Sequence, residues 1–269
     1  MDEQKQQVYH FWNQASCGEV LYLNQATPAA YARQAEQRYA LEPMIKEFAQ
    51  FTDYKDQDVL EIGVGLGAEH QQFAQAGARL HGIDLTQRAI EHTQQRLSSS
   101  QLTSNLQVAD AEQLPFADQS FDLVYSWGVL HHTPNTAKAI EEVYRVLKVG
   151  GEAKLMIYHK YSMVGYMLWL RYALLTGRPY KTLSDIYAQY LESPGTKAYS
   201  IKEARALLQS FQSVTITTML THGDLLTSAV GQRHKGWCLT LAKKLWPRWL
   251  IKSFCPTHGL FMLIHAKRT

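Results

Sequence analysis

Short apolar runs alternate with amphipathic stretches through the middle of the chain. Five runs have the length and composition of buried β-strands, at residues 58–62, 79–84, 105–109, 121–126 and 152–158. Three stretches between them have helical character, at residues 68–76, 86–97 and 135–147. Strands separated by helices of this length predict right-handed β-α-β crossovers, and therefore a mainly parallel, doubly wound sheet with helices on both faces.

Residues with known preferences for helix ends support these boundaries. Thr86 is a suitable N-cap, and Gly77 fits the left-handed position that commonly ends a helix. Ser200 and Glu203 have the spacing of a capping box, which predicts a helix from there to about Phe211. Alternating segments at 213–220 and 260–266 predict two further strands, which brings the expected sheet to seven.

Two regions lie outside this α/β pattern. Residues 1–55 are helical in character, with Ala29 to Gln50 as the longest predicted segment, and residues 159–199 contain two amphipathic, aromatic-rich stretches. We therefore expect four parts: an N-terminal helical cover (1–55), an α/β core (56–158), an inserted helical cap (159–199), and a C-terminal part that completes the sheet and carries a basic tail (200–269).

Charge is distributed unevenly over this plan. The 269 residues are 46% hydrophobic and 19% charged, which excludes disordered, collagen-like and coiled-coil chains. The formal net charge of +3 conceals an acidic body, because no acidic residue follows Asp224. The tail after that residue holds eight basic side chains: Arg233, Lys235, Lys243, Lys244, Arg248, Lys252, Lys267 and Arg268.

The tail allows two interpretations. Leu241 to Lys252 combines tryptophan with lysine, as an interfacial membrane segment does, but Pro247 breaks or starts a helix within it. A solvated basic face, paired with the acidic body or with a neighbouring subunit, is therefore preferred over peripheral membrane contact. No recognition module or RNA-binding motif points to a nucleic acid. A monomer or a homodimer is expected.

Sequence features also bear on the compartment. The polar first residues lack the apolar core of a signal peptide, and the most apolar stretch, Met163 to Leu175, is too short for a span and contains Arg171. Cys17, Cys238 and Cys255 are far apart and odd in number, so they form neither a disulfide framework nor a zinc pattern. The sequence therefore predicts a soluble, cytoplasmic protein.

A glycine-rich turn follows the first predicted strand. In Glu61-Ile62-Gly63-Val64-Gly65-Leu66-Gly67 the glycines allow a tight turn and close approach of a ligand to the backbone, in front of a helix N-terminus that favours an anionic group. With Ala68 the turn also fits the dinucleotide fingerprint G-x-G-x-x-G/A. A nicotinamide-dependent enzyme therefore remains an alternative interpretation of this loop.

Carboxylates end the next two predicted strands. Asp84 lies where a carboxylate bridges two ribose hydroxyls, which an NAD enzyme would also use. Asp110 lies where a carboxylate and the next backbone N–H can read an adenine edge. Because ligands of such sheets bind beyond the carboxyl ends of the strands, these residues are expected to share one site.

Four motifs in succession carry a family resemblance. They are D-A-x-x-L-P-F at 110–116, F-D-x-V at 121–124, L-H-H at 130–132 and R-V-L-x-x-G-G at 145–151. With the glycine loop, residues 57–158 resemble the small-molecule branch of the class I S-adenosylmethionine-dependent methyltransferases. The family's usual second acidic residue before the last glycine is absent here. The resemblance implies a Rossmann-like, seven-stranded methyltransferase sheet.

The resemblance also implies a set of cofactor-binding residues. Gly63, Gly65 and Gly67 would contact the methionine part, with Glu61 orienting their loop, and Asp84 with Leu85 would hold the ribose. Asp110 with Ala111 and Glu112 would bind the adenine, and Ser126 with Trp127 would flank the sulfur of the methyl donor. S-adenosyl-L-methionine is thus the expected cofactor and S-adenosyl-L-homocysteine its product.

Catalytic and acceptor-binding residues are harder to identify. A general base is needed only if the acceptor arrives protonated, and His131, His132 and His159 follow the relevant strands. The histidine pair also recurs across the family with unrelated acceptors, which favours a role in loop architecture or pocket lining. No third ligand is spaced for a metal beside the pair, so no metal is expected. Trp12, Tyr39, Tyr158 and Tyr161 are the candidates for acceptor contact, although such aromatic residues more often pack a core.

The sequence therefore predicts methyl transfer to a small-molecule acceptor, at oxygen, nitrogen or carbon, in biosynthesis or specialised metabolism. A quinone or lipid methyltransferase that docks on membranes through the basic tail is the alternative. A non-catalytic cofactor-binding partner protein and an NAD(P)-dependent oxidoreductase are more remote alternatives.

Overall fold

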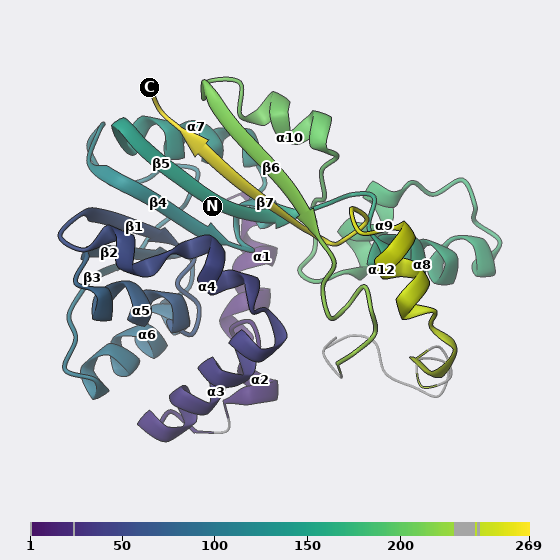
Figure 1. The fold of residues 1–269 in the computed structure, drawn as a ribbon, viewed down its shortest axis with the longest axis horizontal. Coiled ribbons are helices and arrows are strands. Elements are labelled where there is room, and N and C mark those ends of the chain that lie inside the picture. The colour runs from purple at the N-terminus through teal and green to yellow at the C-terminus, as the bar shows by residue number, and fades with distance from the viewer. Residues whose placement is uncertain (1, 24, 229–239, 241–242) are drawn as a thin grey trace.

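The computed structural model describes residues 2–23, 25–228, 240 and 243–269, and it contains one seven-stranded mixed sheet (Figure 1). The sheet order is β3-β2-β1-β4-β5-β7-β6. The strands are β1 (Asp58–Ile62), β2 (Arg79–Asp84), β3 (Asn105–Val108), β4 (Phe121–Trp127), β5 (Leu147–Tyr158), β6 (Ser213–Met219) and β7 (Phe261–Lys267). The first five are parallel, and β7 is antiparallel to both β5 and β6. The predicted doubly wound sheet is confirmed.

Helices between the strands follow the sequence signals closely. They are α5 (Ala68–Ala76), α6 (Gln87–Ser99), α7 (Thr136–Val146) and α10 (Ile201–Leu207), with the short helix η2 (Leu130–His132) after β4. The Thr86 side chain accepts the backbone N–H of Ala89, and both halves of the Ser200 and Glu203 capping box form. Each cap satisfies N–H groups that would otherwise lack a partner at the start of a helix.

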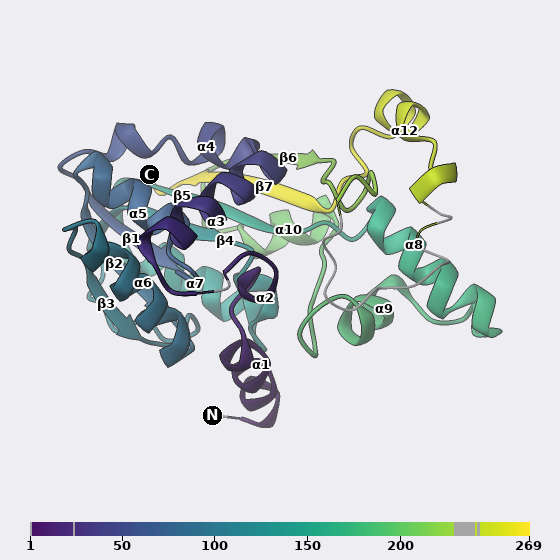
Figure 2. The same cartoon turned by 90° about the horizontal axis from the view of Figure 1, so that it is seen from below.

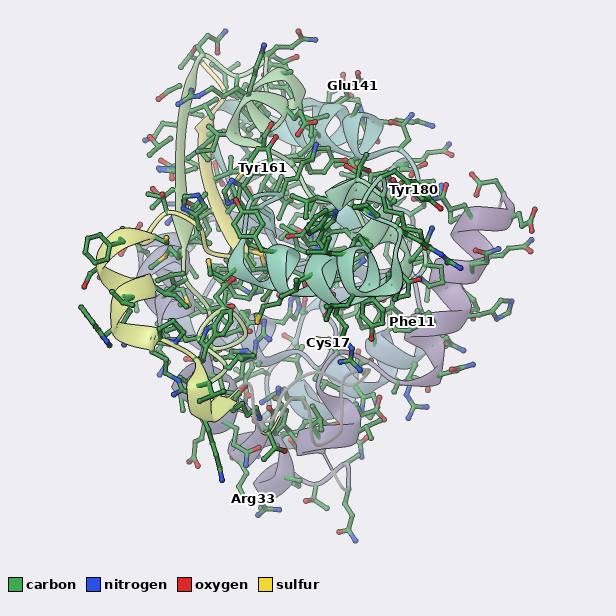
Figure 3. All side chains as sticks on the ribbon, turned by 90° about the vertical axis from the view of Figure 1, so that its right-hand side faces the viewer. Phe11, Cys17, Arg33, Glu141, Tyr161 and Tyr180 are labelled. Carbon is green, nitrogen blue, oxygen red and sulfur yellow. The ribbon has the colours of Figure 1, made fainter. Side chains whose placement is uncertain are left out.

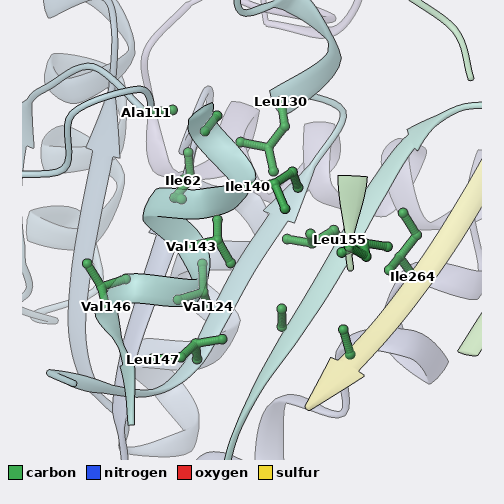
Figure 4. Close-up of a cluster of buried hydrophobic side chains, with 14 of the residues drawn as sticks. Ile62, Ala111, Val124, Leu130, Ile140, Val143, Val146, Leu147, Leu155 and Ile264 are labelled. Atoms are coloured by element: carbon green, nitrogen blue, oxygen red, sulfur yellow. The ribbon is translucent and has the colours of Figure 1, made fainter. Parts of the chain in front are cut away.

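Packing on the two faces of the sheet follows the strand alternation. Leu60 and Val124 belong to a cluster that α7 and α10 cover, and Figure 4 shows part of this cluster. Val59 belongs to the cluster on the opposite face, where α4 (Met44–Ala49) and α5 contribute Ile45 and Phe73. Burial of each such side chain contributes roughly 1.5–3 kcal/mol. Figure 2 shows the helices above and below the sheet.

The N-terminal part differs from the prediction in one respect. It contains α1 (Glu3–Gln14), α2 (Glu19–Tyr22), α3 (Pro28–Leu41), α4 (Met44–Ala49) and η1 (Phe51–Tyr54). The single helical segment from Ala29 to Gln50 is therefore wrong, because the chain breaks at Glu42 and Pro43. A proline disfavours helical backbone in the residue before it, and Glu42 has the non-helical angles φ −127° and ψ 62°.

Two strand and helix boundaries also differ. β5 begins at Leu147, five residues before the predicted start at Glu152, and it includes Gly150 and Gly151. The register shift between Phe121 and Leu123 marks a bulge beside this extension. The helix after Ser200 ends at Leu207 instead of near Phe211.

The cap and part of the tail lie together at one end of the molecule in both views (Figures 1 and 2). The elements there are α8 (Met163–Tyr172), η3 (Leu174–Thr176), α9 (Leu183–Tyr190) and α12 (Arg248–Phe254). α12 begins immediately after Pro247, so this proline starts a helix. Arg233, Lys235, Cys238 and residues 241–242 of the tail lie outside the described residues. No described helix has both the length and the apolar composition that crossing a bilayer requires.

Candidate active site

A cavity of about 720 Å³ lies beyond the carboxyl ends of the parallel strands. Many of the residues expected to bind a ligand line it: Trp12, Gly63, Gly65, Gly67, Asp84, Leu85, Asp110, Ala111, Trp127, His132 and Tyr158. The residues come from the ends of five strands and from α1. The cavity therefore occupies the position at which open α/β sheets bind ligands.

The glycine loop after β1 is the floor of one part of this cavity. Gly63, Gly65 and Gly67 all have positive φ, at 84°, 52° and 73°. A Cβ at Gly63 would lie 2.1 Å from the Val129 side chain, and one at Gly67 would lie 2.9 Å from the Thr93 hydroxyl. Gly65 has no atom within 4 Å of its Cβ position, so its open side faces space that a ligand can use.

Asp84 is held in a fixed orientation beside this loop. Its Oδ1 accepts hydrogen bonds from both the backbone N–H and the hydroxyl of Thr86, each at 2.9 Å. Its Oδ2 accepts the Gly65 N–H at 3.2 Å. Burial raises the pKa of this carboxyl, and the hydrogen bonds oppose that effect. Such an oriented carboxylate is suited to accept hydrogen bonds from neighbouring hydroxyl groups.

Asp110 and Glu112 are joined to the N-terminal helix α1. The Lys5 ammonium lies 2.5 Å from Asp110 Oδ2 and 2.8 Å from Glu112 Oε2, and the lysine is only 8% exposed. Burial alone would lower the pKa of Lys5, but its bonds to the two carboxylates outweigh burial and raise it. Glu112 also accepts the Asn135 N–H and does not line the cavity, whereas Asp110 does.

Two of the expected cofactor residues lie behind the glycine loop. Glu61 is 2% exposed, and its Oε2 lies 2.8 Å from Nδ1 of His70. Burial raises the pKa of Glu61 and lowers that of His70 to about 3. The Ser126 hydroxyl donates to the Ile62 carbonyl at 3.0 Å. Both side chains therefore contact the protein rather than the cavity, where they position the loop and the end of β4.

An ion-pair cluster that sequence reasoning did not identify lies between the loop and Trp127. Arg38 Nε donates to Glu69 Oε1 at 2.7 Å, and Arg38 also approaches Glu42 at 3.7 Å. Trp127 Nε1 donates to Glu42 Oε2 at 3.2 Å. These residues come from α3, its C-terminal end and α5, and no local motif marks them. Arg38 lines the cavity, and a guanidinium group is suited to bind a carboxylate.

A second cluster joins His132 to the cap. His132 Nε2 lies 3.4 Å from Glu192 Oε2, which also accepts the Tyr158 hydroxyl at 2.7 Å. On the other side of the ring, His132 Nδ1 lies 2.9 Å from the Ser193 hydroxyl and 3.1 Å from the Thr196 hydroxyl. Glu192 was not predicted as a site residue, because its contacts are distant in sequence.

The other two candidate histidines do not line the cavity. His131 is fully buried and packs against Tyr158 with the rings tilted by 38° and their centroids 3.9 Å apart, and burial lowers its pKa well below the usual range. His159 Nδ1 lies 3.2 Å from the Gly259 carbonyl, to which it can donate. The ligand atoms of His131, His132 and Glu192 lie within 4.8 Å of one another. The sequence spacing showed no third group beside the histidine pair, whereas the fold brings Glu192 there.

Of the four aromatic candidates for acceptor contact, two line the cavity and two do not. Trp12 packs edge-on against His132 with ring centroids 5.3 Å apart, and Tyr158 packs edge-on against the same ring at 6.1 Å. Tyr39 lies outside the cavity wall, with its hydroxyl buried. Tyr161 is 47% exposed and also lies outside the wall.

Apolar side chains form a large part of the remaining cavity wall. They come from α2, the cap and the C-terminal part, and include Leu21, Val164, Met167, Leu168, Leu170, Leu175, Leu191, Leu226, Trp246, Leu260 and Phe261. Cavities with mostly apolar walls and a few placed polar groups are typical of small-molecule sites. The polar groups on this side are those of the His132 and Glu192 cluster, together with Arg171, Thr221, His222, Ser228 and Lys243.

Comparisons with known proteins agree with this geometry. Residues 60–155 match the family model described as "Methyltransferase domain". Over 119 residues, which are 43% of this chain and 27% of the relative, the chain is 34% identical to phosphoethanolamine N-methyltransferase 2 of Caenorhabditis elegans. It is also 32% identical to the sterol 4-C-methyltransferase strm-1 of the same organism, over 101 residues that are 37% of this chain and 30% of that protein. The matched part thus spans less than a third of each of these two relatives.

A solved structure extends the likeness to almost the whole chain. Phosphoethanolamine N-methyltransferase 2 of Haemonchus contortus, in complex with phosphomonomethylethanolamine and S-adenosylhomocysteine, superposes with a TM-score of 0.61. The match covers 97% of this chain and 60% of that one at 18% sequence identity, a level that shows a common fold. Residues 60–155 are thus similar to a methyltransferase domain, and the chain shares the fold of this solved methyltransferase.

Proposed function

We propose that this chain transfers the methyl group of S-adenosylmethionine to an apolar small molecule that carries one ionisable hydroxyl or amine. The observation that carries the proposal is a single cavity, which joins the glycine loop and Asp84 to a wall of apolar cap residues. The matched relatives are named for a polar acceptor, phosphoethanolamine, and for an apolar one, a sterol. The apolar wall favours an acceptor of the second kind.

The cofactor half fits the proposed cofactor group by group. The open side of Gly65 and the positive φ of the loop leave room for the methionine part, and Arg38 is suited to its carboxylate. Asp84 Oδ2 is placed to accept hydrogen bonds from the ribose hydroxyls. Asp110 would accept from the adenine amino group, and the Ala111 N–H would donate to a ring nitrogen. When bound, the cofactor supplies an electrophilic methyl group on a positively charged sulfur.

The residues around His132 would remove the acceptor's proton. A hydroxyl that attacks the methyl carbon must lose its hydrogen, and a base within hydrogen-bond reach lowers the barrier to that step. His132 Nε2 and Glu192 Oε2 face one another at 3.4 Å, so a hydroxyl beside them can give its proton to either atom. Tyr158 donates to the same carboxylate oxygen and thereby fixes its position.

The remaining alternatives predict different ligands. A nicotinamide oxidoreductase would also use Asp84, so the distinction must come from binding experiments. Calorimetry should give saturable binding of S-adenosylhomocysteine and none of NADH. A transfer assay with methyl-labelled S-adenosylmethionine and hydrophobic phenols or quinols should then give labelled product. Binding of NADH without binding of S-adenosylhomocysteine would overturn the proposal, and binding of the cofactor product without transfer to any acceptor would support a non-catalytic partner protein instead.

The four-part division of the chain is part of this proposal. In it, the α/β core binds the cofactor, while the N-terminal cover, the cap and the C-terminal part enclose the acceptor.

A further inference from the structure

Exposed apolar side chains gather on the cap and α12 at one end of the molecule, and two more lie on α2, which lines the same cavity. Figure 3 faces this end, with α12 at the left and the cap in the centre. The side chains form what we call the apolar rim: Val20, Leu21, Tyr161, Leu170, Leu174, Leu175, Tyr180, Leu245, Trp249, Leu250 and Phe254. In the described part of the chain, the other large hydrophobic side chains with comparable exposure are Val108, Val149 and Ile201, and they lie on β3, β5 and α10.

Part of the apolar rim lies at the mouth of the cavity. Leu21, Leu170 and Leu175 line the cavity wall and are at the same time 39%, 47% and 74% exposed. Residues that belong both to the wall and to the surface mark the position of an opening. Trp249 and Phe254 lie farther out, at 69% and 74% exposure, and do not line the cavity.

Basic residues accompany the rim, and acidic residues are absent from its two longest segments. No Asp or Glu occurs from residue 163 to 184 or after Asp224. The described basic side chains of these segments near the rim are Arg171, Arg178, Lys181, Lys243, Lys244, Arg248 and Lys252. None of them forms an ion pair with a carboxylate of the described residues. Lys267 and Arg268, by contrast, lie at the opposite end of β7, where Lys267 pairs with Glu152.

We propose that the apolar rim docks on an anionic lipid surface, so that the acceptor passes from the bilayer into the cavity. Exposed tryptophan, tyrosine and leucine side chains enter the boundary between headgroups and acyl chains, while lysine and arginine attract anionic headgroups. A cavity mouth within such a surface lets an apolar acceptor enter without crossing water. The passage of the acceptor rests on the proposed function, whereas the docking does not.

The charge of the rim decides between a lipid surface and a second copy of this chain. Two copies joined through their rims would bring basic side chains of the same sign together, which opposes association. An anionic bilayer supplies the complementary charge. The tail is therefore interpreted as part of a docking surface, in place of the solvated face that its sequence favoured.

Sedimentation with lipid vesicles tests the docking. The chain should bind vesicles of equal parts phosphatidylcholine and phosphatidylglycerol, and bind them much less when salt is raised from about 0.1 M to about 0.5 M. The double variant Trp249→Ser/Phe254→Ser and the double variant Lys244→Gln/Lys252→Gln should each weaken this binding about tenfold. None of these four residues lines the cavity, so calorimetric binding of S-adenosylhomocysteine should be unchanged.

Matched variants on other surfaces provide the controls. Val149→Ser/Ile201→Ser removes apolar side chains that are 66% and 40% exposed, and Lys138→Gln/Lys202→Gln removes two exposed charges. Both should leave vesicle binding unchanged. The proposal is overturned by absence of salt-sensitive binding, by equal losses in the controls, or by a dimer that Trp249→Ser/Phe254→Ser dissociates without any vesicle binding. If docking holds while S-adenosylhomocysteine does not bind, only the proposed function fails.

Discussion

The cofactor half and the acceptor half of the cavity are built in different ways. The cofactor half consists mainly of short loops directly after β1, β2 and β3, and some of its side chains are held by sequence neighbours, as Asp84 is by Thr86. The acceptor half is assembled from α1, α2, the end of β4, the cap and the C-terminal part. Its contacts join distant parts of the chain, as in the hydrogen bond from Tyr158 to Glu192, which lies 34 residues later. A common fold can therefore keep one half constant while insertions change the other.

The largest expected effect concerns Asp84 in the cofactor half. Asp84→Ala removes a carboxylate that would accept charge-assisted hydrogen bonds from two ribose hydroxyls, which together contribute about 3 kcal/mol. Affinity for S-adenosylhomocysteine should therefore fall about 100-fold in calorimetry. Asp118→Ala removes an exposed carboxylate on another loop and should bind like the parent protein. Unchanged affinity of the Asp84 variant would show that the ribose lies elsewhere.

Glu192 tests the acceptor half separately. Glu192→Gln keeps an acceptor for the Tyr158 hydroxyl but removes the negative charge beside His132. The turnover number should fall about 50-fold, just below the usual range for loss of a proton acceptor, since His132 remains. Affinity for S-adenosylhomocysteine should change less than about twofold.

The exposed Glu141→Gln is the control for this variant, and its turnover should be normal (Figure 3). A loss of cofactor affinity as large as the loss of turnover would place Glu192 in the cofactor half. Normal turnover would exclude it as a proton acceptor.

Lys5 connects the two halves, because α1 lines the acceptor side and pairs with the end of β3. Lys5→Met leaves Asp110 and Glu112 without their shared cation, so α1 should detach more readily and the cofactor product should dissociate about tenfold faster. Stopped-flow displacement of S-adenosylhomocysteine measures this rate, with the exposed Lys202→Met as control. Tighter binding in the variant would mean that Lys5 competes with the adenine for Asp110.

Local signals explain why the cofactor half could be predicted from the sequence. Apolar runs define the strands, and glycines or carboxylates directly after them mark the site, as Gly63 and Asp84 illustrate. Thr86 and Ser200 cap helices within three residues of their own position. Each of these interactions depends on sequence neighbours, so the chain reveals them without knowledge of the fold.

The acceptor half could not be predicted to the same depth, because its contacts are distant in sequence. Lys5 reaches Asp110 across 105 residues, and no periodicity relates the two. No sequence motif surrounds Glu192, and it can be recognised as a site residue only in the folded chain, where the cap places it beside His132. Aromatic composition selected Tyr158 correctly as a cavity residue, but it selected Tyr161 by the same criterion, although that side chain is half exposed and outside the wall.

Replacement of Glu152 is expected to have the smallest effect, and it tests whether the stability of the fold can change without a change in ligand binding in either half of the cavity. Burial opposes ionisation of Glu152, but bonds to Lys267 and His265 outweigh burial and lower the carboxyl pKa from 4.5 to about 2. A depressed pKa stabilises the fold above the ordinary value and ceases to do so as pH falls through the folded-state value. Glu152→Gln should therefore lower the free energy of unfolding by about 1 kcal/mol at neutral pH, after allowance for solvent screening, and by much less near pH 2. Urea denaturation at the two pH values measures the difference.

Because Glu152 lies near the start of β5, away from the strand ends that form the site, S-adenosylhomocysteine should bind this variant normally. If the Glu152 variant instead bound S-adenosylhomocysteine more weakly, a loss of sheet stability would by itself be enough to reduce binding. The weaker binding expected for the Asp84 and Lys5 variants would then report on the sheet as a whole, and not on the half of the cavity in which each residue lies.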